Sequence, residues 1–332
     1  MRRAAEMAVS EINARGGVHG RQLQLRLRDD SANEDAALRV ARALRDDPAV
    51  MAVIGHLNSG PTKVAARVYG AGEDPVVVIS PSASSPDLAG ISPWFFRVCP
   101  SDLAFGSRLA QYAYNTLGAR RVAVLYINDD YGRGVRRTFA AEFTRLGGQV
   151  TTEDPYLSGA GGVEPYFTRI QRNGGVDALV LATHRAGAEE ALRERARMRV
   201  PWPVMGGDAL TGIETLGPLA EYVRVASAYL ADRPGAANAT FTAEYARQFD
   251  GTRPDHRGAG AYDIVHLLAR AMDQGGVSRS AIREYLATVG NSRPAYDGVT
   301  GRIAFDERGE VPDKSVVIGV VRGGRLATEA SQ

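Results

Sequence analysis

Short runs of apolar, mostly β-branched residues alternate with longer amphipathic stretches over most of the chain. The apolar runs predict strands at residues 22–27, 51–54, 76–79, 122–126, 178–181, 204–205 and 223–227. The amphipathic stretches between them predict helices at residues 36–44, 103–117, 135–146 and 188–197. Apolar strands that alternate with helices are typical of parallel sheets covered on both faces. The pattern therefore predicts an α/β protein.

Both ends of the chain extend this pattern. The stretch AAEMAVSEINARGG near the start places its apolar residues on one helical face and ends at glycines, as helices do. Further helices are expected at 240–249 and 259–272, with a last strand at 316–321. Because the chain begins on a helix and not on the apolar core of a secretion signal, we expect no export signal in this sequence.

Composition narrows the possible partners. The 332 residues are enough for two lobes, and 44% hydrophobic with 23% charged residues is an ordinary globular composition. The 40 basic and 38 acidic residues give a net charge of +2, whereas nucleic-acid or membrane binding normally requires a basic excess. No apolar run is long enough to insert into a membrane. Cys99 is the only cysteine and is expected to be a small buried hydrophobe without a disulfide partner.

The loop VIGHLNSGPTKVAA follows the predicted strand at 51–54, and ligands of parallel sheets bind after strands. Its glycines have the spacing of a P-loop, but Pro61 occupies the place of the lysine that contacts phosphates. Pro61 fits the first turn of a helix, with Ser59 near its N-cap. Such a helix N-terminus suits a carboxylate better than a triphosphate. Alternatively, Ser59 only caps its helix.

A second serine loop, PSASSPDL, follows the strand at 76–79 and contains Ser82, Ala83 and Ser84. It could be only a capped turn in which Ser85 opens the next helix. Two such loops on consecutive strands would, however, converge at one sheet edge and surround one small group with hydroxyls and amides. We therefore expect these loops to capture a carboxylate.

Different side chains follow the strands in the middle third of the chain. Tyr131, His184 with Arg185, and Asp208 come after three successive predicted strands. An aromatic ring, cationic groups and one acid thus complement the hydroxyls of the first third. We expect two half-sites, one on each of two lobes.

Several fragments, in their order and spacing, make the chain similar to type I periplasmic binding proteins of the branched-chain amino-acid transport class, the Leu/Ile/Val-binding family. They are AVSEINARGGVHGRQLQLRLRDD, AVIGHLNSGPT, VVVISPSASSPDL, FFRVCPSD, VAVLYINDDYGRG, PVMGGDAL and GRIAFDERGE. The resemblance covers nearly the whole chain. It implies two Rossmann-like lobes with parallel sheets, joined by three crossovers, which enclose a small ligand by hinge closure.

The resemblance also implies where the lobes divide. Lobe one would comprise residues 1–99 and 231–306, and lobe two residues 100–230 and 307–332. The crossovers would lie near 97–101, 228–232 and 303–310. The family's first strand precedes the helix on which this chain begins, so we expect that strand to be missing from lobe one.

The ligand-binding residues implied by the resemblance are Ser59, Ser82, Ala83, Ser84, Tyr131, His184 and Asp208. The serines would surround the α-carboxylate and ammonium of an amino acid, with Ser82 contributing its backbone carbonyl. Tyr131 would form a wall of the site, and Asp208 would pair with the ammonium. A buried charge needs such a partner, so a zwitterion fits better than a neutral ligand.

The chain departs from the family in the second half-site. His184 and Arg185 stand where the binders of aliphatic side chains carry aromatic residues. If Arg185 points inward, a ligand with a polar or acidic side chain is plausible; if it points outward, it is a solvated surface charge. The disulfide of some relatives is also absent, with Ala32 and Asn58 near the expected positions.

An enzyme would need a nucleophile–base pair or a metal cluster, and the sequence contains no motif for either. We expect no catalytic residues, no metal and no cofactor. His56 is interpreted as shaping its loop, because no orienting acid is placed next to it. The acidic residues at 29–30 and 128–130 are interpreted as helix caps and not as cation ligands.

The expected function is therefore that of a monomeric solute-binding protein, periplasmic or extracellular and with a lipid anchor as one option. It would capture an amino acid or related carboxylate and deliver it to an ABC permease in the membrane. Two alternatives stay open. The chain could be the ligand-sensing domain of a receptor, or it could bind an amide or an aromatic carboxylate.

Overall fold

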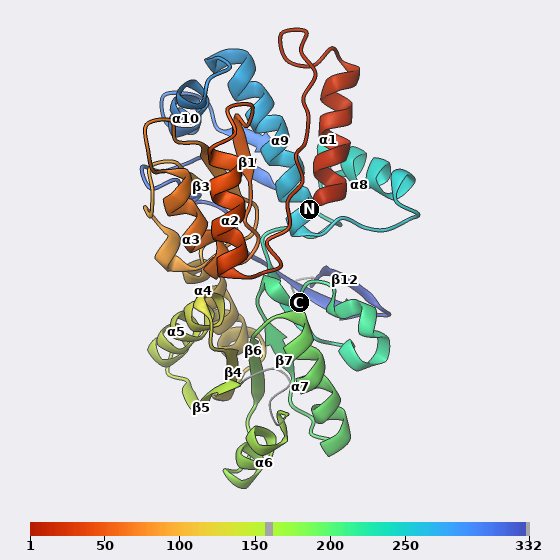
Figure 1. Ribbon diagram of the computed structural model, residues 1–332. Coiled ribbons are helices and arrows are strands. Elements are labelled where there is room, and N and C mark those ends of the chain that lie inside the picture. Colours follow the sequence, from red (N-terminus) through yellow and green to blue (C-terminus); the bar gives the residue numbers. More distant parts are fainter. Residues whose placement is uncertain (157–161, 330–332) are drawn as a thin grey trace. The chain divides into compact units, whose positions relative to one another are not determined.

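The computed structural model describes residues 1–156 and 162–329 (Figure 1). The chain divides into two compact units, each built from two segments. Unit 1 comprises Met1–Ser101 and Arg233–Lys314, and unit 2 comprises Asp102–Asp232 and Ser315–Gln332.

The last passage from unit 1 to unit 2 lies at residues 314–315, later than the expected crossover at 303–310. The reason is that residues 306–314 bond within unit 1. The N–H of Arg97 donates to the carbonyl of Gly309 at 3.0 Å, and Nζ of Lys314 donates to Oγ1 of Thr300 at 2.6 Å. The expected assignment of residues 307–314 to lobe two is therefore wrong.

Unit 1 is built on a parallel sheet whose described strands have the order β1 (Ala52–Ile54), β2 (Val77–Ser80), β3 (Phe95–Arg97). A separate antiparallel pair consists of β9 (Tyr296–Gly298) and β10 (Gly301–Ile303). The helices of this unit are α1 (Arg2–Ala14), α2 (Glu34–Arg45), α3 (Ser59–Tyr69), the short η1 (Pro86–Leu88), α8 (Ala236–Gln248), α9 (His256–Gly275) and α10 (Arg279–Thr288).

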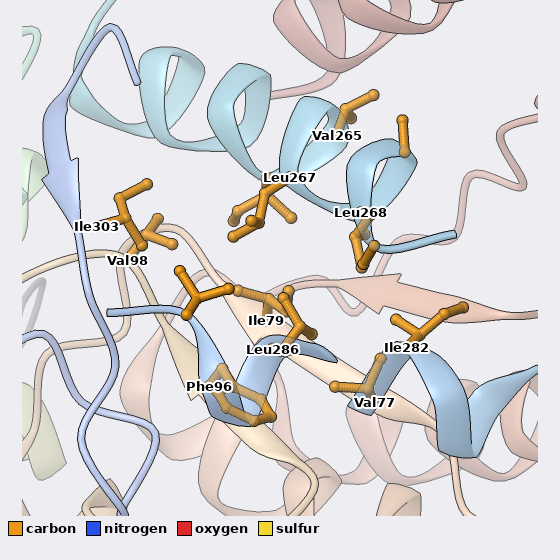
Figure 2. Close-up of a cluster of buried hydrophobic side chains, with 14 of the residues drawn as sticks. Val77, Ile79, Phe96, Val98, Val265, Leu267, Leu268, Ile282, Leu286 and Ile303 are labelled. Carbon is orange, nitrogen blue, oxygen red and sulfur yellow. The ribbon is translucent and has the colours of Figure 1, made fainter. Parts of the chain in front are cut away.

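The strands of this sheet are buried on both faces. Val77 and Ile79 pack into a core with α1, α9 and α10, and Figure 2 shows them facing Leu267 and Ile282. Val78, between them in β2, packs into a second core with α2 and α3. This division follows from the two-residue period of a strand. The predicted coverage of a parallel sheet on both faces is confirmed for unit 1.

Unit 2 contains a larger sheet with the strand order β12-β11-β8-β7-β6-β4-β5 over the described residues. Its parallel strands are β4 (Arg121–Ile127), β5 (Gln149–Tyr156), β6 (Ala178–Ala182), β7 (Val204–Gly206) and β8 (Arg224–Ser227). The antiparallel strands β11 (Val317–Arg322) and β12 (Arg325–Thr328) extend one edge. Its helices are α4 (Asp102–Gln111), the π-helix η2 (Tyr112–Thr116), α5 (Asp130–Arg145), α6 (Glu164–Arg172), α7 (Arg185–Met198), and the 3₁₀ segments η3 (Asp208–Leu210) and η4 (Ile213–Ala220).

The larger sheet is also covered on both faces. Val122 and Val124 of β4 pack with α4 and α5, whereas Ala123 and Leu125 of the same strand pack with α6 and α7. The carboxyl ends of the parallel strands thus open onto loops that begin helices. These loops carry the residues predicted for the second half-site.

The expected strand at 22–27 is wrong, because no regular strand forms there. The N–H of Leu23 donates to Oδ1 of Asn13 at 2.8 Å, and its carbonyl accepts from Nδ2 of Asn13 at 2.9 Å. The backbone of Leu23 therefore bonds to a side chain of α1 where a strand would bond to a neighbouring strand.

Candidate functional site

The first serine loop connects β1 to α3. Asn58 is the N-cap of α3 but makes no side-chain capping bond, and Pro61 lies in the first turn as predicted. Ser59 is the first helical residue, so the alternative in which it only caps this helix is wrong. Its hydroxyl, in a residue only 3% exposed, accepts a hydrogen bond from the N–H of Ser85 at 3.2 Å. Ser59 therefore joins the first serine loop to the second.

The second serine loop follows β2 and is fixed at its start by Ser80. Oγ of Ser80 donates to the carbonyl of His56 at 2.7 Å. The same oxygen accepts from the N–H groups of Ala83 at 2.9 Å and Ser82 at 3.3 Å. One buried hydroxyl thus links the loop after β1 to the turn of the loop after β2.

A buried arginine of β3 holds the rest of the loop. Nη1 of Arg97 donates to the carbonyls of Ala83 at 3.1 Å and Ser85 at 2.9 Å, and the guanidinium forms an ion pair with Glu310. Cys99 is buried, as predicted, and its thiol lies 3.4 Å from the carbonyl of Ala83. Both backbone polar groups of Ala83 are therefore engaged inside the protein.

Ser84 differs from its neighbours because it is 1% exposed and has no hydrogen-bond partner among the described residues on its N–H, carbonyl or hydroxyl. The carbonyl of Ser82 is likewise unpartnered within the described chain. Leaving a buried polar group unsatisfied costs about 1–3 kcal/mol, so nearly all such groups in proteins have partners. The loop thus presents two donors, at Ser84, and one acceptor, at Ser82, to a ligand.

A histidine from a distant part of the chain contacts this loop. Nε2 of His256, the first residue of α9, lies 3.3 Å from Oγ of Ser82. His256 is 2% exposed, and burial lowers the pKa of its imidazole to about 3. The side chain is therefore neutral at physiological pH. Sequence analysis missed this residue, because 174 positions separate it from Ser82.

His56 has an acidic partner, so the expectation that no acid orients it is wrong. Its Nδ1 lies 2.6 Å from Oδ2 of Asp30, and its Nε2 lies 3.2 Å from the hydroxyl of Tyr69. This hydrogen bond lowers the pKa of the Asp30 carboxyl. Asp30 does not cap α2, because Asn33 does so through Ala36 at 3.0 Å.

The Asp30–His56 pair does not form a catalytic arrangement. The phenol of Tyr69 is the described partner of Nε2, and burial raises the pKa of this phenol, which makes it a poor nucleophile. The pair instead orients the carbonyl of His56 toward Ser80. This agrees with the interpretation that His56 shapes its loop.

In unit 2, Tyr131 and His184 form a stacked pair. Their ring centroids are 5.5 Å apart, with an interplanar angle of 21°. Nε2 of His184 lies 2.9 Å from Oδ2 of Asp129, whose Oδ1 accepts from the N–H of Gly132 at 2.7 Å. Asp129 is therefore the N-cap of α5, as predicted, and it also fixes the imidazole beside Tyr131.

Asp208 lies next to this pair at the carboxyl end of β7 and is 2% exposed. Burial, and then the nearby carboxylates of Asp208 and Asp102, raise the pKa of the Tyr131 phenol. A Cβ atom on Gly207 would lie 2.4 Å from the phenol oxygen, so glycine is required for this close approach. The structure thus brings Tyr131, His184 and Asp208 together, and adds the buried Asp102, which sequence analysis missed.

Arg185 is engaged within unit 2. Its Nε donates to the carbonyl of Gly212 at 3.0 Å, and its Nη2 donates to Oγ1 of Thr215 at 2.8 Å. The side chain is 42% exposed. These contacts favour the alternative in which Arg185 is a surface charge.

Within residues 1–156 and 162–329, no group of three or more His, Cys, Asp or Glu side chains is placed to hold a metal ion. No helix in the same ranges has both the length and the apolar character needed to cross a membrane.

The two units and their loops have the type I periplasmic binding protein fold. A substrate-binding protein of an ABC transporter from Desulfitobacterium hafniense, solved in complex with Leu, superimposes with a TM-score of 0.85 and 29% identity. The match covers 99% of this chain and 95% of that chain. The family described as periplasmic binding protein matches residues 1–325, and the chain belongs to this family. The resemblance inferred from the sequence fragments is confirmed.

Curated relatives agree with this assignment. Leu/Ile/Val-binding protein homolog 1 of Brucella suis is 25% identical over 316 residues, which cover 93% of this chain and 82% of that protein. An amino acid binding protein of Pseudomonas aeruginosa is 32% identical over 174 residues. That second match covers 52% of this chain and only 46% of the relative's own length.

Proposed function

We propose that this chain is the extracytoplasmic substrate-binding protein of an ABC transporter and that it binds an α-amino acid. The observation that carries the proposal is the loop from the half-buried Ser82 to the buried Ser84. The polar groups of Ser84 and the carbonyl of Ser82 have no hydrogen-bond partner among the described residues. Donors for an anion and an acceptor for a cation, side by side, match the carboxylate and ammonium of one amino acid.

In unit 1, the N–H and hydroxyl of Ser84 would donate to the α-carboxylate. The first turn of α3, which begins at Ser59, supports this role because helix N-termini favour anions. The carbonyl of Ser82 would accept from the ammonium. Ala83 would contribute no backbone hydrogen bond, since both of its backbone groups are already engaged.

In unit 2, the buried carboxylate of Asp208 would pair with the same ammonium. The stacked rings of Tyr131 and His184 would form a wall beside the ligand side chain. His184 makes this wall partly polar. The ligand side chain is therefore not restricted to branched aliphatic groups.

The proposed mechanism is hinge closure. A ligand that engages residues of both units stabilises the closed form by its differential affinity for that form. The closed, monomeric protein would then deliver the amino acid to a membrane permease, outside the cytoplasm and without a cofactor or catalytic step.

A thermal-shift screen tests this function, because a ligand that binds only the folded state raises its melting temperature. The probes are the twenty L-amino acids, beginning with L-leucine, together with benzoate and small amides. We expect at least one amino acid to raise the melting temperature, and its deaminated acid and decarboxylated amine to do so much less. A shift by benzoate or an amide alone would reject the amino-acid assignment.

A further inference from the structure

We propose that His256 is a positioning residue of the ligand site, which holds the hydroxyl of Ser82 so that the Ser82 carbonyl is presented to the ligand ammonium. This inference rests on the proposed function. It concerns a residue that lies outside the set implied by the family resemblance. The contact acts on the peptide that joins Ser82 to Ala83.

Two hydrogen bonds fix the orientation of that peptide, one to the N–H of Ala83 and one to the side chain of Ser82. The N–H of Ala83 points at Oγ of Ser80, 2.9 Å away. In a trans peptide the N–H and C=O groups point in opposite directions, so the carbonyl of Ser82 points away from Ser80. Its remaining freedom is rotation about the Cα of Ser82, and the bond from the Ser82 hydroxyl to Nε2 of His256 restricts that rotation. The carbonyl itself has no hydrogen-bond partner in residues 1–156 and 162–329.

The helix that carries His256 is fixed against the same loop. A Cβ atom on Gly260 would lie 3.0 Å from Cβ of Pro81, so the α9 backbone passes close to the residue before Ser82. His256 and Gly260 are four residues apart and share one face of α9. Residues on this face of α9 thus contact both Pro81 and Ser82. Most of the 20 residues of α9 are buried, which fixes the position of the helix.

The charge state of His256 suits this role. Burial lowers its pKa most, Arg257 and the amino group of Met1 lower it further, and Asp255 is the charged group that raises it. A neutral imidazole bonds the hydroxyl in either tautomer, since Nε2 either donates or accepts. An imidazolium at this position would instead repel the ammonium that the Ser82 carbonyl receives. The neutral ring therefore positions the carbonyl without opposing the ligand.

Titration calorimetry with two probes separates this role from a general structural one. The probes are L-leucine and 4-methylpentanoate, which is leucine without its ammonium, and the variants are His256→Phe, His256→Asn, Ser82→Ala and the His256→Phe/Ser82→Ala double variant. We expect His256→Phe to weaken L-leucine binding roughly tenfold, the size of a bond to a charged group, and to leave 4-methylpentanoate nearly unchanged. When Ser82 is already replaced by alanine, adding His256→Phe should not weaken L-leucine binding further. Equal losses for both probes, or additive losses in the cycle, would overturn the proposal.

A second measurement does not depend on any ligand. In the unliganded protein, ¹⁵N NMR of the imidazole should show a neutral ring from pH 5 to pH 8, and Ser82→Ala should shift the Nε2 signal. Protonation of the His256 imidazole between pH 5 and pH 8, or an Nε2 signal that Ser82→Ala does not shift, would reject the inference whatever the ligand. Failure of L-leucine and every other amino acid to bind the unaltered protein would instead reject the proposed function. If His256→Phe does not fold, His256→Asn serves the same comparison.

Discussion

The hydroxyl of Ser59 accepts a hydrogen bond from the backbone N–H of Ser85 at a distance of 3.2 Å. Ser59 begins α3 after β1, and Ser85 caps η1 after β2, so this bond joins the loops of two neighbouring parallel strands. The carboxyl ends of such strands meet at one sheet edge. The bond leaves Ser84, the residue before Ser85, buried and without a partner among the described residues.

The Ser59–Ser85 bond predicts the effect of Ser59→Ala. The N–H of Ser85 would lose its partner in a buried position, which costs about 1–3 kcal/mol. We therefore expect urea denaturation to show a lower free energy of unfolding for the unliganded variant, with an unchanged slope. A free energy of unfolding equal to that of the unaltered protein would contradict the role of this bond.

Ser84→Ala should behave in the opposite way. Its hydroxyl bonds to no described residue, so removing it takes away an unsatisfied group and should leave the stability of the unliganded protein unchanged or slightly raised. The affinity for an amino acid should fall about tenfold, because the carboxylate loses a donor. Ser59→Ala is the matched control, since it removes a bonded hydroxyl from the same site. Normal affinity of Ser84→Ala would remove this hydroxyl from the ligand-binding set.

Asp30 predicts an acid-dependent change in stability. Its hydrogen bond with His56 holds the pKa of this carboxyl below 3.8, so its contribution is present above that pH and is lost as the pH falls through the lowered value. Between about pH 5 and pH 3 the unaltered protein should lose more stability than Asp30→Asn. Urea midpoints measured for both proteins across this range test the expectation. Parallel losses would show that the Asp30–His56 contact does not stabilise the fold.

The buried ammonium of Lys314 predicts that the free energy of unfolding changes with pH above about pH 8. Burial lowers the pKa of its ammonium to about 8 from 10.5, so between these values the unfolded chain binds more protons than the folded one. The free energy of unfolding should therefore rise with pH across this window, by about 3 kcal/mol at most, relative to Lys314→Met. Urea denaturation of the unaltered protein and of Lys314→Met at pH 8, 9 and 10 would measure this rise in the free energy of unfolding. A difference between the two proteins that does not change with pH would refute it.

The sequence predicted those features that depend on local patterns. The period of apolar residues located β1, β2, β4, β6, β7 and β8, and the position of Pro61 located the start of α3. Residues just after strands, such as Tyr131 and Asp208, could be found because parallel strands bring their following loops to one edge.

The features that sequence analysis missed depend on contacts between distant segments. Asp30 precedes α2 in the chain and contacts His56, which follows β1. His256 contacts Ser82 because α9 packs on the second serine loop. Neither pair leaves a spacing signal in the chain. The expected strand at 22–27 does not form for a related reason. Residues with strand propensity form a strand only where a neighbouring strand supplies backbone hydrogen-bond partners, and the N–H of Leu23 bonds to the side chain of Asn13 instead.

The central claim is that one amino acid binds through the serine loop and Asp208, and titration calorimetry on Asp208→Asn tests it most directly. The titrants are the amino acid with the largest thermal shift and its deaminated analogue, each against the unaltered protein and the variant. We expect Asp208→Asn to lose nearly all affinity for the amino acid, because its ammonium would be buried without a counter-charge, and to bind the deaminated analogue no more weakly than the unaltered protein does. Unchanged affinity of Asp208→Asn for the amino acid would contradict the account.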